Sequence, residues 1–285
     1  MSVLRQNFIQ QLELGGFSPK TISAYVAIVL KLSKFHNRSP LLLDRQQICD
    51  YLHYELKVNK LNPSTINQHI GALKAFYRLM APDSNVIKGL PGMKTPSKLP
   101  VVLTCQEVET LFCAVTNIKH LAILELMYSS GIRVGECVSL VPQDIDRRQM
   151  LLRVRSGKGA KERYTVLSNR ALQTISTYYR LHKPTQFLFE GRGGNKYSVR
   201  SIMKIVEKAV MRAGINKKAS SHTLRHSFAT HLLDNGVSLR VIQKLLGHSH
   251  IQSTTVYTHV SNQSITRIIS PLDMLNNREG ANDQQ

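Results

Sequence analysis

The first ninety residues carry an apolar repeat that is typical of helices. After Asn62, apolar side chains recur at steps of four and three residues, and the stripe comprises Ile66, Ile70, Leu73, Tyr77 and Met80. Side chains suited to capping mark three helix starts, namely Ser18 before Pro19, Asp44 three residues before Gln47, and Asn62 before Pro63. The pattern predicts a first domain that is entirely helical.

The stretch from Gly89 to Pro100 interrupts this repeat. It holds three prolines and two glycines within twelve residues, a composition that favours an extended linker over a helix or strand. We therefore expect a helical first domain over residues 1–90, a linker over 91–100 and a second domain over 101–285.

The pattern after the linker mixes helical and strand signals. Helical spacing runs through residues 104–128, and two β-prone runs within 150–168 flank a Gly-Lys-Gly turn. These runs predict a β-hairpin with Lys158 at or beside its tip, from which a lysine can reach into a groove. The expected fold class is mainly α with a small β-hairpin or sheet, an α+β arrangement in the second domain.

A helix beginning near Ser220 combines an apolar face with several basic groups. His222 and Arg225 fall in its first turn, where free backbone amides and the helix dipole favour an anion. Histidines beside an apolar stripe are usually satisfied by local hydrogen bonds. We expect packing for His231.

A second helix follows Ser238 and stops at Gly247 in the manner of a C-terminal cap. His248 emerges directly from that stop, and Tyr257 comes nine residues later. Side chains at element ends can converge from separate parts of a fold. Phosphodiester chemistry would use such a basic set together with a tyrosine.

Basic residues far outnumber acidic ones. The chain has 38 lysines and arginines against 18 acids, a formal charge of +20, so the expected partner is a polyanion, with nucleic acid ahead of an anionic membrane surface. Lys74 and Arg78 lie off the apolar stripe as an i,i+4 pair that could follow a phosphate backbone. Taken singly, these charges also fit a solvated face, and the same holds for Lys158, Lys161 and Arg163.

Two classes of protein are disfavoured by the apolar runs and cysteines. The longest apolar run, residues 121–128, is short and contains Glu125, and no signal-peptide pattern stands at the N-terminus, so we expect a cytoplasmic protein without membrane contact. The cysteines lack paired CxxC spacing, which predicts reduced thiols and no zinc site: Cys49, Cys105, Cys113 and Cys137.

Five stretches of the second domain resemble, in order and spacing, the tyrosine recombinases of the lambda-integrase type. They are GIRVGE (131–136), SGKGAKER (156–163), HTLRHSF (222–228), LLGH (245–248) and TTVYTH (254–259). The helical first domain and its linker are similar to the core-binding domain of that family. The resemblance implies a clamp of two domains around duplex DNA.

The resemblance also implies the central chemistry. Tyr257 would attack a DNA phosphate and leave a 3′-phosphotyrosyl bond with a free 5′-hydroxyl. Arg133 and Arg225 would stabilise the charge that grows on the non-bridging oxygens, so no metal or other cofactor is expected. Glu136 would support Arg133 from behind.

The remaining matched positions supply protons and DNA contacts by the same resemblance. Lys158 would protonate the leaving 5′-oxygen as general acid, while His222 and His248 would donate hydrogen bonds or carry the Tyr257 proton. The sequence leaves open which histidine accepts that proton. For His226, which belongs to the family's LRH string, the resemblance implies a structural role. Contacts to the DNA backbone are expected from Lys74, Arg78, Lys161 and Arg163.

The family resemblance extends to assembly and role. It implies a homotetramer on two synapsed double-stranded sites, exchange through a Holliday junction, accessory proteins of unknown kind and a nucleoid-associated location. An exchange helix is expected over about 263–277. The ending SPLDML resembles integron and transposon recombinases, which favours a mobile-element enzyme.

Three alternatives remain. A chromosome- or plasmid-dimer resolvase would use the same residues. A helix-turn-helix regulator could use residues 238–257, but this leaves Arg133, Lys158 and Tyr257 unexplained. A type IB topoisomerase would share the nucleophile and relax supercoils as a monomer.

Overall fold

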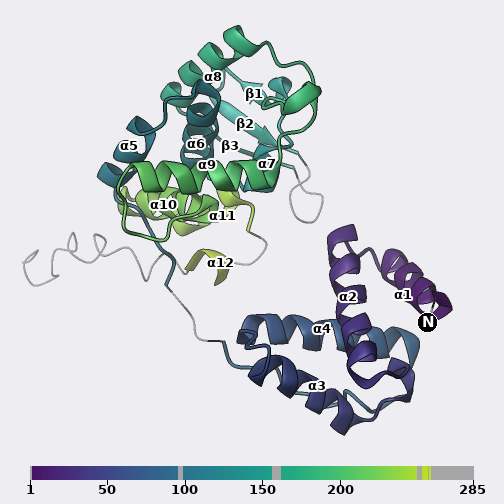
Figure 1. Cartoon of the computed structure of the whole chain (residues 1–285). Helices are drawn as coiled ribbons and strands as arrows, with labels where there is room; N and C mark the ends of the chain where they lie inside the picture. The colour runs from purple at the N-terminus through teal and green to yellow at the C-terminus, as the bar shows by residue number, and fades with distance from the viewer. Residues whose placement is uncertain (1, 96–98, 156–161, 249–251, 256, 258–285) are drawn as a thin grey trace, which may run out of the picture. The chain divides into compact units, whose positions relative to one another are not determined.

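The structure, a computed structural model, describes residues 2–95, 99–155, 162–248, 252–255 and 257. The chain forms two compact units, Met1–Ser97 and Lys98–Gln285, each with its own apolar core (Figure 1). Within the described ranges, no helix combines the length and apolarity needed to span a bilayer.

Unit 1 is built from helices. Its elements are α1 (Ser2–Leu14), α2 (Pro19–His36), the 3-10 turn η1 (Pro40–Leu42), α3 (Arg45–Lys57) and α4 (Pro63–Met80). Helices α1, α3 and α4 all pack on α2 or on one another, and their shared core contains Phe8, Leu32, Ile48, Leu73 and Phe76.

The capping chemistry that the sequence indicates is present in unit 1. Ser18 accepts from the Thr21 amide at 3.2 Å and Asn62 from the Thr65 amide at 2.9 Å, while Asp44 forms a reciprocal capping box with its third helical residue. The predicted stripe faces the core, with Met80 only partly buried. The expectation of a helical first part is therefore confirmed.

Unit 2 combines helices with one small sheet. Its helices are α5 (Cys105–Cys113), α6 (Ile118–Ser130), α7 (Val134–Cys137), α8 (Asn169–His182), α9 (Val199–Arg212), α10 (Ser221–Asp234), α11 (Leu239–Leu246) and α12 (Gln252–Thr255), with 3-10 turns η2 (Pro142–Asp144) and η3 (Arg192–Gly194). Strands β1 (Ile145–Asp146), β2 (Leu151–Val154) and β3 (Arg163–Val166) form an antiparallel sheet in that order.

The sheet contains the predicted hairpin. Strands β2 and β3 pair antiparallel, with Leu152 opposite Thr165 and Val154 opposite Arg163. Lys158 and Lys161 lie in the connection between these strands, outside the described residues. The hairpin is therefore described at its base, where β3 begins.

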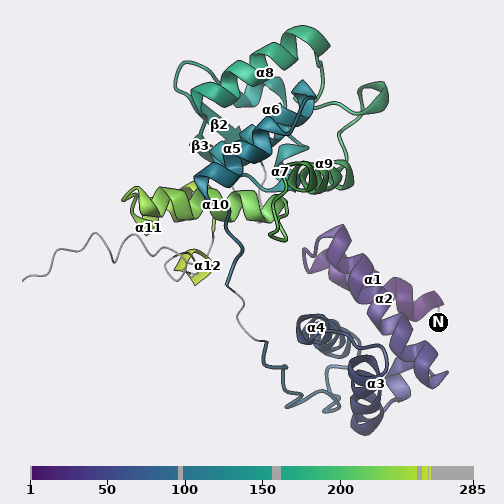
Figure 2. The same ribbon diagram turned by 60° about the vertical axis from the view of Figure 1, so that its left-hand side comes forward.

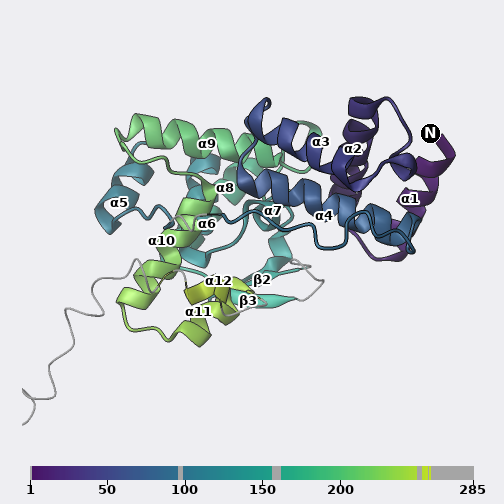
Figure 3. The same cartoon turned by 90° about the horizontal axis from the view of Figure 1, so that it is seen from below.

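Helix α6 forms the centre of unit 2. Its residues Ala122, Ile123, Leu124, Leu126 and Met127 are all fully buried, as expected of a helix that is apolar on every side. Figures 1 and 2 show α6 between α8 and α10. Helix α10 also contacts α11. Helix α11 contacts both β3 and α12, so segments distant in sequence meet at α11 (Figure 3).

Candidate active site

The site begins where α6 ends. Gly131 caps α6 in the left-handed region at φ 61°, and a Cβ at this position would collide with the ring of Phe228 on α10. The chain then turns into α7 with Arg133 as its N-cap residue. A glycine is required because the helix end is pressed directly against α10.

Glu136 holds Arg133 through two contacts. Its Oε2 accepts from the Arg133 amide at 2.7 Å and its Oε1 from Arg133 Nη1 at 2.9 Å. The Arg133 side chain is 29% exposed, whereas Glu136 is buried. Glu136 thus occupies the supporting position expected from the sequence, while the Arg133 guanidinium stays accessible.

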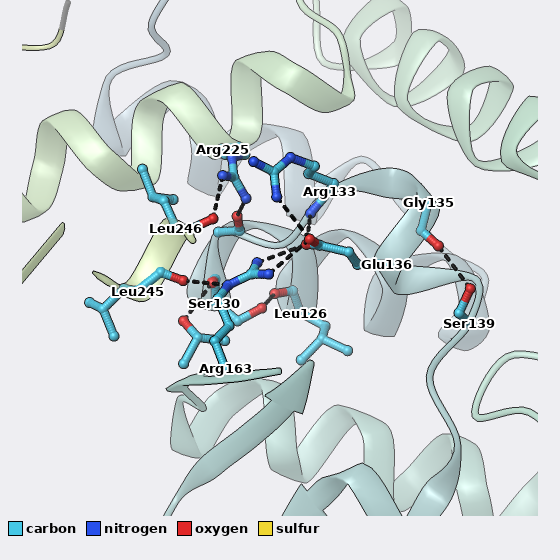
Figure 4. Close-up of polar contacts among 12 residues, drawn as sticks. Leu126, Ser130, Arg133, Gly135, Glu136, Ser139, Arg163, Arg225, Leu245 and Leu246 are labelled. Carbon is cyan, nitrogen blue, oxygen red and sulfur yellow. Dashed lines mark hydrogen bonds and ion pairs between the residues drawn. The ribbon is translucent and has the colours of Figure 1, made fainter. Parts of the chain in front are cut away.

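Arg225 on α10 is fixed by two helix ends. Its Nη1 donates to the carbonyl of Gly131 at 2.6 Å and its Nη2 to the carbonyl of Leu246 at 2.7 Å (Figure 4). Both acceptors stand at helix C-termini, where carbonyls lack partners within the helix and the dipole is negative. Burial, together with the neighbouring Arg133, lowers the pKa of Arg225 to about 10, so the group stays charged at neutral pH.

Arg163 at the start of β3 completes the network. Its Nη1 and Nη2 donate to the two oxygens of Glu136, each at 2.8 Å, and its Nε donates to the Leu245 carbonyl at 2.8 Å. Burial alone would raise the pKa of Glu136, but hydrogen bonds from Arg163 and from the Arg133 amide outweigh it and hold the pKa at about 2.

Arg163, for which the sequence predicts contacts with the DNA backbone, lies largely within the protein. Its side chain is only 10% exposed, and its Nε, Nη1 and Nη2 atoms all donate to protein acceptors. These partners, Glu136 and Leu245, lie 27 and 82 residues away in the sequence and leave no local pattern.

The tyrosine lies against two histidines. Tyr257 is 1% exposed, and its Oη is 3.1 Å from Nδ1 of His226 on α10. The ring of His248 stacks on that of Tyr257 with centroids 6.5 Å apart, and His248 Nδ1 is 2.9 Å from Thr254 Oγ1. His226, for which the sequence suggested only a structural role, is therefore the histidine that touches the phenol.

The three groups are neutral in this setting. Burial, aided by His222 and Arg225, lowers the pKa of His226 to about 4, and burial with the nearby arginines lowers the pKa of His248 to about 4. Burial raises the pKa of Tyr257, although Arg225 and Arg133 oppose that shift. Tyr257 Oη can therefore donate a hydrogen bond to an unprotonated Nδ1 of His226.

The structure also describes the surroundings of other residues that the sequence singled out. His222 is exposed in the first turn of α10, and His231 packs with its Nδ1 2.9 Å from Tyr128 Oη. Lys74 and Arg78 are exposed on α4 of unit 1. In the part of the chain that the structure describes, no three His, Cys, Asp or Glu side chains are grouped as metal ligands.

The cluster has the composition needed for phosphoryl transfer. Two charged guanidinium groups, Arg133 and Arg225, lie close enough to Tyr257 to act on its pKa, and fixed cations of this kind stabilise a transition state in which phosphate charge increases. Two neutral imidazoles stand beside the phenol that would attack.

Comparisons with known proteins agree with this geometry. Residues 101–264 match the phage integrase family, and residues 4–84 match the N-terminal SAM-like domain of phage integrases. The chain is 35% identical over 277 residues to a putative integrase/recombinase, y4qK, of Sinorhizobium fredii, covering 96% of this chain and 90% of that protein. It is 33% identical over 286 residues to the tyrosine recombinase XerC of Staphylococcus aureus, covering 94% and 95%.

Solved structures show the same fold. A lambda integrase dimer bound to a COC′ core site superposes with a TM-score of 0.73 at 18% identity, covering 92% of this chain and 95% of that one. A lambda integrase tetramer bound to a Holliday junction gives the same TM-score and identity, with 90% and 76% covered. The chain therefore belongs to the phage integrase family and is a tyrosine recombinase.

Proposed function

We propose that this recombinase cleaves and rejoins DNA with Tyr257 Oη as the nucleophile. The observation that carries the proposal is the position of the Tyr257 phenol, which is hydrogen-bonded to His226 and lies within the electrostatic influence of Arg225 and Arg133. Attack on phosphorus forms a 3′-phosphotyrosyl bond as the bond to the 5′-oxygen breaks. A 5′-hydroxyl from a partner strand reverses the step, which exchanges strands through a Holliday junction without an external energy source.

The arginines neutralise the phosphate. Arg133 and Arg225 donate to the non-bridging oxygens, and both are held in advance by protein acceptors, so little reorganisation accompanies the reaction. No metal ion or cofactor is needed to supply that charge.

Proton transfer and hydrogen bonding are divided among four groups. The contact at 3.1 Å favours His226 Nδ1 as the acceptor of the Tyr257 proton, while His248 orients the phenol and His222 donates to the phosphate. Lys158, which lies outside the described residues, gives a proton to the departing 5′-oxygen. Protons and bonds then balance within one strand cleavage.

Both units contribute to binding a double-stranded site. The basic excess is 13 against 5 residues through Leu99 and 25 against 13 beyond it, which supports contact with DNA along the whole chain. Residues 1–90 act as the core-binding domain and 101–285 as the catalytic domain of a C-shaped clamp. Lys74, Arg78 and Lys161 contact the DNA backbone.

The active assembly is a homotetramer on two synapsed sites. The exchange helix expected over about 263–277, a range outside the described residues, would join the protomers. The lambda integrase tetramer on a Holliday junction, which has the same fold, supports this arrangement. The ending SPLDML and the relative named integrase/recombinase support a role in movement of a mobile element.

The test is covalent trapping on a nicked DNA site from which the cleaved strand end dissociates. Wild type forms a denaturant-stable protein–DNA adduct in excess chelator, whereas Tyr257→Phe binds the same DNA with similar affinity and forms none, because only the attacking oxygen is removed. An adduct with Tyr257→Phe, or a wild-type reaction that stops in chelator and returns with magnesium, contradicts the mechanism.

A further inference from the structure

Arg163 is a largely buried basic residue at the start of β3, and the proposed chemistry gives it no part. We propose that Arg163 is a positioning residue, because it joins the two elements that orient the guanidinium groups of Arg133 and Arg225 and so sets the rate of strand cleavage. This inference rests on the proposed function, since it concerns how the phosphate-binding arginines are held.

The first group that Arg163 contacts is the carboxylate of Glu136. Oε1 accepts from Nη1 of Arg163 at 2.8 Å and from Nη1 of Arg133 at 2.9 Å, and Oε2 accepts from Nη2 of Arg163 at 2.8 Å and from the Arg133 amide at 2.7 Å. Each oxygen therefore serves both arginines. Because the Arg163 fork fixes the plane of the carboxylate, it also fixes the direction in which Arg133 is held.

The second group that Arg163 contacts lies at the C-terminal end of α11. Arg163 Nε donates to the Leu245 carbonyl at 2.8 Å, and the next carbonyl, that of Leu246, accepts from Arg225 Nη2 at 2.7 Å. Successive carbonyls of one helix turn thus bind Arg163 and Arg225 (Figure 4). A shift of this turn would move an acceptor of Arg225 directly.

Arg163 also explains why a glycine ends α11, because its side chain occupies the space that a Cβ at Gly247 would need. Gly247 has φ 64°, and a Cβ there would lie 2.8 Å from Arg163 Cδ and 3.1 Å from its Nε. The side chain of Arg163 therefore packs closely against the backbone at Gly247, immediately before His248.

Positioning can be separated from simple charge neutralisation of Glu136. A lysine would also neutralise the buried carboxylate, but its single ammonium cannot engage both carboxylate oxygens and the Leu245 carbonyl in the geometry of the guanidinium fork. Arg163→Lys therefore keeps the positive charge and loses the link between Glu136 and the Leu245 carbonyl. Arg163→Ala loses both the charge and the link.

The decisive experiment compares two substrates at saturating DNA. One carries the ordinary scissile phosphate, and the other a methylphosphonate, in which a methyl group replaces one non-bridging oxygen and removes the negative charge that the arginines stabilise. We expect Arg163→Ala to form the covalent adduct about 100-fold more slowly than wild type on phosphate, the scale of loss that small misplacement of reacting groups produces. On methylphosphonate the ratio should fall to about threefold, because the misplaced charges are no longer needed.

Two variants frame this result. Arg163→Lys should stay within about threefold of Arg163→Ala on phosphate and show the same relief on methylphosphonate, which also keeps the test usable if the alanine variant folds poorly. Arg153→Ala is the matched control, because Arg153 on β2 pairs with Glu162 in an ion pair whose side chains are 40% and 48% exposed. Its cleavage rate should stay within about twofold of wild type, since exposed pairs contribute little.

The outcomes are distinguishable. Equal loss on both substrates would assign Arg163 to general stability of the fold and overturn the positioning role, and full activity of Arg163→Lys would reduce that role to neutralising Glu136. Failure of wild type to form an adduct, or adduct formation by Tyr257→Phe, would instead overturn the proposed function itself.

Discussion

The basic residues proposed to contact DNA in unit 1 and the arginine proposed to act in catalysis in unit 2 differ in their exposure to solvent. Lys74 and Arg78 are exposed one turn apart on α4, and the apolar stripe beside them forms the core of unit 1. Arg225 in unit 2 is 4% exposed, and its guanidinium donates to two helix-terminal carbonyls. Lys74 and Arg78 therefore project from the surface of unit 1, whereas Arg225 is buried inside unit 2.

This difference matches two demands on a cation. An exposed side chain can adapt to the course of a phosphate backbone, and its contribution is screened by salt. A cation that stabilises a transition state must be in place beforehand, which requires rigid partners. The energetic cost of burying Arg225 is offset by carbonyls that helix ends leave without partners.

Replacing Arg225 should give the largest effect in this comparison. Arg225→Ala removes the buried donors to the non-bridging oxygens, and we expect adduct formation at saturating DNA to slow by about 10² to 10³-fold, as for loss of one fixed donor elsewhere. Arg225→Lys should remain strongly impaired, because one ammonium cannot contact phosphate and both carbonyls. A lysine variant with near wild-type rates would show that charge alone suffices.

Features set by near neighbours in the chain could be predicted. The capping residues Ser18, Asp44 and Asn62 act within three residues, and the stripe on α4 repeats within two turns, so both were readable from the sequence. The hairpin and the stop at Gly247 are equally local. Such local patterns predict where helices and strands begin and end, but they do not predict which helices and strands contact one another.

The parts of the site that escaped prediction depend on distant partners. His226 meets Tyr257 across 31 positions, and Arg163 meets Leu245 across 82. Neither contact leaves a periodic or capping signal, so burial and geometry alone reveal them. The one local hint was a glycine after α11, whose positive φ was expected but whose contact with Arg163 was not.

Lys158 offers the next largest effect and tests the hairpin tip. Lys158→Ala should slow cleavage by about 100-fold, because the departing 5′-oxygen lacks a proton. With sulfur at that bridging position the leaving thiolate has a conjugate acid of pKa near 8.5, by analogy with cysteine, so the variant should approach the wild-type rate. Arg225→Ala should stay impaired on the sulfur substrate, and equal failure of Lys158→Ala on both would reassign Lys158 to DNA positioning.

Removing the exposed pair on α4 should change binding without changing chemistry. The double variant Lys74→Ala, Arg78→Ala should weaken DNA affinity by about tenfold and lower the slope of log affinity against log salt by about one to two, one for each phosphate that the variant no longer neutralises. Its cleavage rate at saturating DNA should equal that of wild type. Anisotropy titrations across a salt series measure the first effect, and adduct formation the second.

A matched pair of charges distinguishes contact from general attraction. Lys57 and Lys60 are also exposed in unit 1, so Lys57→Ala, Lys60→Ala removes the same charge from the same unit. A smaller loss of affinity with this variant supports a DNA contact at α4. An identical loss would mean that Lys74 and Arg78 act only through net charge.

The smallest expected effect is the pH dependence that the partly buried histidines His226 and His248 give to the stability of DNA-free protein. Burial lowers the pKa of His226 and of His248 to about 4, against a reference value of 6.5. Between these values the unfolded chain binds protons that the folded chain excludes, so the free energy of unfolding must fall as pH is lowered from about 6.5 toward 4. Well above pH 6.5 both states carry neutral rings, and these groups add no pH dependence.

Urea unfolding at pH values between 5 and 6.5 measures this slope while most carboxylates remain ionised. His226→Gln removes one of these titrating groups and keeps a side chain that can hydrogen-bond to Tyr257 Oη, so its profile should be flatter than that of wild type. His53→Gln serves as the control for the same substitution outside the tyrosine cluster, because His53 is exposed on α3 of unit 1. A His226→Gln profile as steep as wild type would mean that His226 is protonated beside the phenol, and it could then not accept the proton of Tyr257.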